Sequence, residues 1–167
     1  QEKLLEALRD FYAATNAQEL QAATQLVTQC AEIEIPPNTN WTAVEYEFNR
    51  LFVGPTTLLA PPFASAWPED QRSLMGRATM EVRQVYHGLG LAVQQEGNIP
   101  DDHLAFELEA VLVMKSMLAR QIGPPDLETQ YAWLVCEHLA HWVPQMLQAV
   151  REHAGPDSIV AMVTDIL

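Results

Sequence analysis

Apolar residues recur along most of the chain at the spacing of a helix that buries one face. The first such set comprises Leu4, Leu5, Leu8, Phe11 and Tyr12. The same period predicts helices over about 18–30, 42–52, 68–95, 102–122 and 126–142, then one that ends near 153 and a short one over 157–167. Gly-Pro pairs or proline runs separate several of these segments, and the sequence has no strand-like alternation and no internal repeat. We therefore expect an all-α fold, a compact two-lobed helical bundle of about six to seven helices.

The length of 167 residues suits one domain built from two lobes. The stretch from Glu96 to Pro100 joins two long predicted helices and is the best candidate for a hinge. We expect an N-terminal lobe over about 1–95, a hinge over about 96–101 and a C-terminal lobe over about 102–167. Cys30 and Cys136 lie far apart and form no CxxC motif, which suits a reducing compartment.

Acidic residues dominate the charge, with 22 Asp and Glu against 9 Lys and Arg and a formal net charge of −13. Such a chain repels nucleic acid and anionic membranes and attracts a basic partner, although acidity also serves simply to keep an apolar protein in solution. No apolar run reaches the length of a bilayer span, and no basic-then-apolar leader opens the sequence. We expect a cytoplasmic protein that binds no nucleic acid and does not insert stably into a membrane.

The segment from Pro100 to Leu108 places two acids and a histidine at the start of an apolar helix. A helix N-terminus carries free backbone N–H groups and a partial positive charge. We expect either Asp101 or Asp102 to cap this end, which leaves the other carboxylate available to a cationic partner. A plain N-cap with an incidental His103 is the alternative.

Two further groups suggest a metal site or catalysis. His138 and His141 could share a helix face as metal ligands, but no third ligand stands at an obvious spacing. Asp102, His103 and Glu107 could form a proton relay, but no nucleophile motif lies near them. Phosphate-binding glycine loops and the GxSxG elbow are absent from the sequence.

Four segments stand in an order typical of one family. Residues 46–55 (YEFNRLFVGP) form an acidic-aromatic helix that ends in Arg-Leu-Phe-x-Gly-Pro, and residues 60–67 (APPFASAW) give Pro-Pro-aromatic-x-Ser-x-aromatic. Residues 100–108 (PDDHLAFEL) match Pro-Asp-His-Leu-x-x-Glu-Leu with one extra Asp, and residues 137–144 (EHLAHWVP) contain His-Leu-x-x-Trp-x-Pro. Together they resemble the TorD/DmsD family of cytoplasmic chaperones that mature molybdenum-containing redox enzymes.

The resemblance implies a TorD-like helical fold and no catalytic activity. We expect no resident cofactor and no metal, and the sequence leaves open whether a nucleotide or the molybdenum cofactor is bound in passing. The resemblance implies that the chain binds the twin-arginine signal peptide of a molybdenum-cofactor oxidoreductase precursor and holds the apo-enzyme for cofactor insertion before export. It also implies a monomer or a dimer that exchanges lobes around the hinge.

The candidate signal-peptide-binding residues are Phe48, Leu51, Phe52, Pro62, Phe63, Asp101, Asp102 and His103. The acids offer charge-assisted partners for arginine, and the apolar residues offer a groove for the apolar part of the leader. Leu51 and Phe52 suit the core equally well. About four apolar anchors at ~1.5–3 kcal/mol each, set against association costs of ~4–15 kcal/mol, predict roughly micromolar affinity.

Two other functions stay open at this point. One is a helical adaptor that docks the mature part of a redox enzyme, as nitrate reductase assembly chaperones do. The other is a metal-dependent hydrolase that uses His138, His141 and nearby acids.

Overall fold

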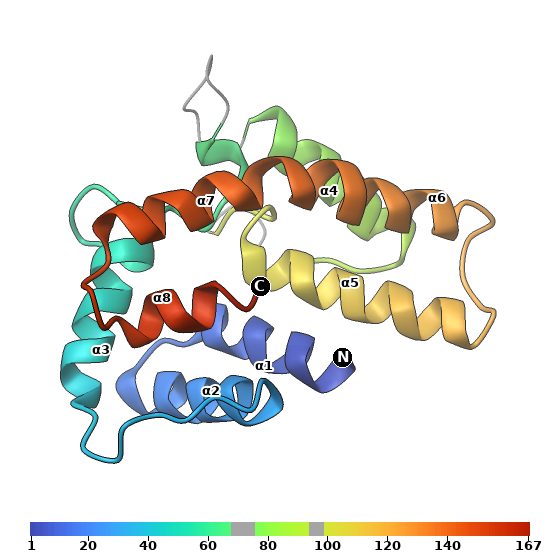
Figure 1. Cartoon of the computed structure of the whole chain (residues 1–167). Coiled ribbons are helices and arrows are strands. Elements are labelled where there is room, and N and C mark those ends of the chain that lie inside the picture. The colour runs from blue at the N-terminus through green and yellow to red at the C-terminus, as the bar shows by residue number, and fades with distance from the viewer. Residues whose placement is uncertain (68–75, 94–98) are drawn as a thin grey trace. The chain divides into compact units, whose positions relative to one another are not determined.

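The computed structural model describes residues 1–67, 76–93 and 99–167, and within these ranges the chain is helical with no β-strand (Figure 1). The predicted all-α fold is confirmed. An isolated antiparallel bridge joins Phe63 and His103, far apart in the sequence. In the described part of the chain, no helix is both long enough and apolar enough to span a bilayer.

The chain divides into two compact units. Unit 1 comprises Gln1–Pro61 and Met146–Leu167, and unit 2 comprises Pro62–Gln145. These boundaries differ from the lobes expected over 1–95 and 102–167. The expected hinge over 96–101 stays a prediction, because residues 96–98 lie outside the described residues.

Unit 1 contains α1 (Glu2–Ala13), α2 (Ala17–Cys30), α3 (Trp41–Phe48), the π-helical turn η1 (Asn49–Val53) and α8 (Ile159–Thr164), together with the later part of α7 (Ala140–His153). Helices α1 and α2 pack side by side, and α8 packs against α2 and α3. The side chains of Asn16, Asn40 and Ser158 cap α2, α3 and α8 by accepting a backbone N–H from the first turn of each helix.

Four aromatic rings form the centre of unit 1. Phe11 contacts Tyr12 and Phe48, and Phe52 contacts the same two rings, with all four centroid distances between 5.2 and 5.5 Å. The rings meet edge to face, which is the favoured geometry because the positive ring edge meets the negative ring face. The apolar spacing of α1 and that of residues 48–52 therefore serve one common core.

The break after η1 depends on Gly54. This residue has a φ of 105°, and its N–H donates to the carbonyl of Asn49 at 2.8 Å, five residues earlier. Side chains rarely tolerate such a φ, so glycine is the residue that lets the chain leave the helix here. The stop predicted at Gly54-Pro55 is confirmed.

Unit 2 contains the 3₁₀ turn η2 (Ala64–Ala66), α4 (Arg77–Gly88), α5 (Leu104–Ala119), α6 (Leu127–Ala132), the π-helical turn η3 (Trp133–Leu139) and the first part of α7. Helix α4 is shorter than the helix predicted over 68–95. It ends at Gly88 because the chain turns at Leu89 and Gly90, where Gly90 has a φ of 72°. The start predicted at Pro68-Glu69-Asp70 lies outside the described residues.

Segments α6, η3 and α7 follow one another without a loop from Leu127 to His153. Pro144, which the sequence predicts to kink or restart a helix, lies inside α7 in its second turn. Proline cannot donate a backbone hydrogen bond to the carbonyl four residues earlier. The π-helical turn η3 directly precedes this part of α7, so the irregular backbone and the proline fall close together.

Candidate functional site

Two loops of unit 2 that carry the second and third motifs lie side by side. The N–H of Leu104 donates to the carbonyl of Pro62 at 2.9 Å, and the N–H of Ala64 donates to the carbonyl of Asp102 at 3.1 Å. These bonds flank the bridge between Phe63 and His103, whose ring centroids lie 5.0 Å apart. The structure therefore brings together five of the eight predicted residues: Pro62, Phe63, Asp101, Asp102 and His103.

Asp102 is fully buried and holds the two loops to α4. Its Oδ2 accepts the N–H of Ser65 at 2.5 Å, and its Oδ1 accepts the hydroxyl of Thr79 at 2.8 Å. A buried carboxylate needs such donors because its desolvation is otherwise very costly. Asp102 is thus an internal anchor in this structure.

Asp101 is also fully buried, and it pairs with Arg83 of α4. The guanidinium donates from Nη2 to Oδ1 at 2.6 Å and from Nε to Oδ2 at 3.0 Å, while the hydroxyl of Tyr86 donates to the Asp101 carbonyl at 3.1 Å. Burial, and then the charges of the neighbouring carboxylates, raise the pKa of Tyr86. This two-point pairing is the strongest geometry between an arginine and a carboxylate.

The expectation that one acid caps α5 and leaves the other free is wrong. The N-cap is His103, whose Nδ1 accepts the N–H of Ala105 at 3.1 Å. Both acids face inward because α4 supplies an arginine and a hydroxyl that satisfy them. Burial lowers the pKa of His103 to about 4, against a smaller opposing effect from the charge of Asp102.

A second buried polar group links α5 to residues 137–144, the fourth of the family-like segments. Glu107 is fully buried and bonds through Oε1 to Nε2 of His138 at 2.7 Å, while the indole N–H of Trp142 donates to its Oε2 at 3.2 Å. Burial raises the pKa of Glu107 despite these partners. Burial alone would lower the pKa of His138, but the hydrogen bond and charge of Glu107 outweigh it, so that pKa is raised as well. The two titratable groups therefore share one short hydrogen bond in a largely buried site.

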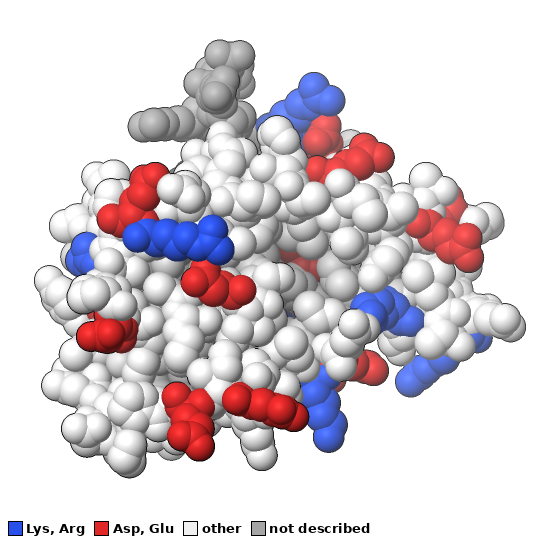
Figure 2. Space-filling view, viewed as in Figure 1, with Lys and Arg blue, Asp and Glu red and all other residues white. Residues whose placement is uncertain are grey.

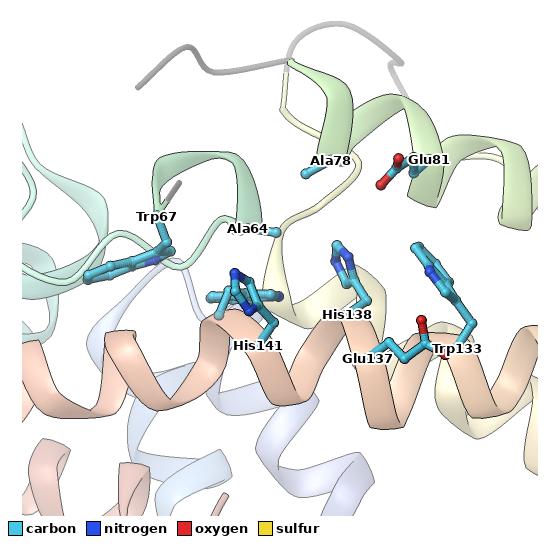
Figure 3. Close-up of a pocket in the computed structure, with 9 residues that line it drawn as sticks. Ala64, Trp67, Ala78, Glu81, Trp133, Glu137, His138 and His141 are labelled. Atoms are coloured by element: carbon cyan, nitrogen blue, oxygen red, sulfur yellow. The ribbon is translucent and has the colours of Figure 1, made fainter. Parts of the chain in front are cut away.

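A pocket of about 240 Å³ opens in front of this group (Figure 3). Its lining includes Trp67, Glu81, Trp133, Glu137, His138 and His141. Figure 3 shows Glu81 on α4 facing Trp133 and His138 across the pocket. Aromatic rings and carboxylates around one hollow favour a cationic group with a flat or apolar body.

The π-helical turn η3 arranges one wall of the pocket. Trp133 and His138 stand five residues apart, and in an α-helix they would point about 140° away from each other. In a π-helix, hydrogen bonds span five residues, which brings such residues to the same side. Their ring centroids lie 5.1 Å apart with 32° between the planes.

The other three predicted residues belong to unit 1. Phe48, Leu51 and Phe52 are 2%, 0% and 3% exposed, so they are core residues in this structure. The nearby Arg50 donates to the carbonyl of His153 at 2.7 Å, at the end of α7. The first motif therefore has a clear structural role in unit 1.

The structure places no third metal ligand beside the candidate pair His138 and His141 in the described residues. Within residues 1–67, 76–93 and 99–167, no group of three His, Cys, Asp or Glu side chains is placed to hold a metal ion. His138 bonds to Glu107, and His141 is exposed beside the pocket.

The sequence patterns do not predict several residues of the site. Thr79, Arg83 and Tyr86 lie at the i, i+4 and i+7 positions of α4, so all three meet the Asp101–Asp102 turn. Polar residues at the positions of a buried helix face are the signal that could have found them. Trp133 gives no such signal, because its position depends on the π-helical turn.

Comparison with known proteins identifies the family. The family model of the nitrate reductase delta subunit matches residues 13–148. The Tat proofreading chaperone DmsD of Salmonella typhi is 32% identical over 108 residues, which cover 65% of this chain and 49% of DmsD. The chaperone protein TorD of Aliivibrio salmonicida is 25% identical over 132 residues, which cover 77% of this chain and 61% of TorD.

A solved structure shows the same fold. The crystal structure of an Archaeoglobus fulgidus protein assigned to redox enzyme maturation superposes with a TM-score of 0.65, at 21% identity, over 99% of this chain and 89% of that one. The chain spans about half the length of DmsD. The chain belongs to the nitrate reductase delta subunit family, and its predicted resemblance to the TorD and DmsD chaperones is confirmed.

Proposed function

We propose that the chain acts in the cytoplasm as a chaperone that binds the twin-arginine signal peptide of a molybdenum-cofactor oxidoreductase precursor. It holds the precursor for cofactor insertion before export. The observation that carries this proposal is the family match over residues 13–148, because that range contains all four motifs. The name Tat proofreading chaperone, given to DmsD, supports the same role.

The predicted residues take different parts in this proposal. Phe63 and His103 are partly exposed, so in this proposal they contact the leader directly. Pro62, Asp101 and Asp102 are buried and fix the position of those two side chains. Phe48, Leu51 and Phe52 act through the core of unit 1, and a contact with the apolar part of the leader requires that core to open.

Charge supports a basic partner. The chain carries −13, and Figure 2 shows acidic groups spread over the face in view with a few Lys and Arg between them. A leader with two adjacent arginines is attracted to such a surface, and added salt weakens the attraction because the screening length is about 8 Å at physiological ionic strength. We expect roughly micromolar affinity that falls as salt rises.

Calorimetric titration tests the proposal. The ligand is a synthetic molybdoenzyme leader with its arginine pair and apolar stretch, and the control is the same leader with both arginines changed to alanine. Binding of the first peptide, weakened by salt and by the alanine changes, supports the role. Failure of every such leader to bind the folded chain refutes it.

A second candidate is an adaptor that docks the mature part of a redox enzyme. The specific observation in its favour is the family description itself, a nitrate reductase delta subunit. The same calorimeter separates the two functions, because an adaptor binds the leaderless enzyme and ignores the isolated leader.

A further inference from the structure

We propose that the pocket bounded by Trp133, Glu81 and Glu137 binds the guanidinium group of one arginine of the leader. This inference rests on the proposed function and names a receptor for the basic part of the peptide that none of the eight predicted residues supplies. Asp101 and Asp102 are not that receptor in this structure, because both carboxylates are buried and bonded to Arg83, Ser65 and Thr79.

The pocket combines the two groups that a guanidinium requires. Trp133 presents a partly exposed indole, the aromatic ring that attracts cations best. Glu81 comes from α4 and Glu137 from η3, and both line the same hollow. Among the described residues that line it, none is a lysine or arginine, so the charge of the lining is negative.

Size and shape favour arginine over other cations. A volume of about 240 Å³ far exceeds the ~30 Å³ that one water occupies in the liquid, and it leaves room for one long side chain. A guanidinium is flat and weakly hydrated, so it stacks on indole and still donates in its own plane to carboxylates. A lysine ammonium is compact and strongly hydrated, and it gains less from the ring.

The chain's own Arg77 shows that Glu81 accepts a guanidinium. Arg77 Nε donates to Glu81 Oε1 at 2.6 Å, yet the Arg77 side chain is 91% exposed and that of Glu81 is 38% exposed. An exposed pair four residues apart on a helix contributes little stability, so an incoming arginine displaces or shares it at small cost.

Buried hydrogen bonds and a ring contact hold the wall behind the site. Glu107 bonds to both His138 and Trp142, and the ring of His138 supports that of Trp133. Trp133 and Glu81 also line an adjoining hollow of about 360 Å³ on the same helices. A preorganised aromatic wall lowers the ordering cost of binding.

The test uses the full chain and charge-matched variants. Glu81→Gln with Glu137→Gln removes both pocket carboxylates and keeps their shape, while Glu6→Gln with Glu128→Gln makes the same change in net charge at exposed residues outside the pocket. We expect the pocket variant to bind the arginine leader about fivefold to tenfold more weakly and the alanine leader unchanged, and the control variant to stay within about twofold. In Trp133→Leu, the preference for an Arg-Arg over a Lys-Lys leader, about fivefold in the wild type, should fall to about one.

A direct readout comes from the indole N–H resonance of Trp133, assigned by its loss in Trp133→Phe. N-acetyl-arginine N-methylamide should shift this resonance in the wild type and not in the pocket variant, and the lysine analogue should shift it less. The inference is overturned if the pocket variant binds the arginine leader with wild-type affinity, or if it loses the arginine and alanine leaders equally.

Failure of the proposed function looks different. If no leader binds the wild type, the proposed function is refuted. Titration with N-acetyl-arginine N-methylamide then tests by itself whether the pocket binds a guanidinium group. A Trp133 shift that depends on Glu81 and Glu137 keeps the inference, and no shift overturns it.

Discussion

Truncation of Asp102 should destabilise the chain strongly. Its buried carboxylate accepts the Ser65 N–H at 2.5 Å and the Thr79 hydroxyl at 2.8 Å. A hydrogen bond to a charged group contributes ~1.5–3 kcal/mol, so Asp102→Ala should lower the free energy of unfolding by about 3–6 kcal/mol. A domain of this kind has only ~5–15 kcal/mol in total. The variant is therefore expected to lose a large share of its stability.

Urea unfolding followed by tryptophan fluorescence measures this loss. Asp102→Asn keeps one carbonyl acceptor and should lose about half as much as the alanine variant. Thr79→Val removes one donor and should cost about 1–3 kcal/mol. The double variant Asp102→Ala with Thr79→Val should cost little more than Asp102→Ala alone, because the two residues share one bond.

Stability of Asp102→Ala within about 0.5 kcal/mol of the wild type would refute the reasoning, since surface substitutions have effects of that size. The result also governs how binding data are interpreted. A loss of leader binding in Asp102→Ala reports a lost contact only if the folded fraction is measured in the same sample.

Three further outcomes are expected. The wild type should lose up to about 3 kcal/mol of its free energy of unfolding as the pH falls from ~6.5 to ~4. The reason is that the unfolded chain takes up a proton on His103, whereas the folded chain, in which the His103 pKa is about 4, excludes it. His103→Asn keeps an N-cap acceptor but has no such proton to take up, so it should not show this loss. Parallel urea-unfolding profiles of wild type and variant across this range would contradict that. His138→Leu leaves Glu107 buried without its main partner and should lower the free energy of unfolding by about 3–5 kcal/mol. The double variant Glu107→Met with His138→Leu should lose less in the same urea assay. An equal or larger loss in the double variant would contradict the coupling. Arg77→Gln frees Glu81 and should strengthen arginine-leader binding about twofold in calorimetry, while Arg120→Gln should not, and weaker binding of Arg77→Gln would count against the pocket.

The sequence predicts those parts of the fold that depend on local rules. The period of apolar residues places most helices, and Gly54 marks a true helix end because it adopts a φ of 105°. Helix α4 is the exception. Its apolar period continues through Val85 to Leu89, although the helix ends at Gly88 and the chain turns at Leu89 and Gly90. Local patterns describe a helix face, but they do not tell where the chain leaves it.

The burial of Asp101 and Asp102 depends on partners far along the chain. Arg83 is 18 residues from Asp101, and Ser65 is 37 residues from Asp102. A pair of acids before a helix is typical of an exposed cap, and only the tertiary contacts reverse that expectation. Trp133 escaped for a different reason, because a period of 3.6 residues does not describe a π-helical turn.

The division of the chain has a consequence for its synthesis. Unit 2 is one continuous segment, Pro62–Gln145, whereas unit 1 needs both Gln1–Pro61 and Met146–Leu167. A ribosome that adds ~5–20 residues per second takes about 1–4 s to make Met146–Leu167. During that interval every residue of unit 2 already exists, while the rings of Phe11, Tyr12, Phe48 and Phe52 still lack α8. The order of translation therefore favours unit 2 as the first part to fold and leaves an unfinished aromatic core as the stage most exposed to aggregation.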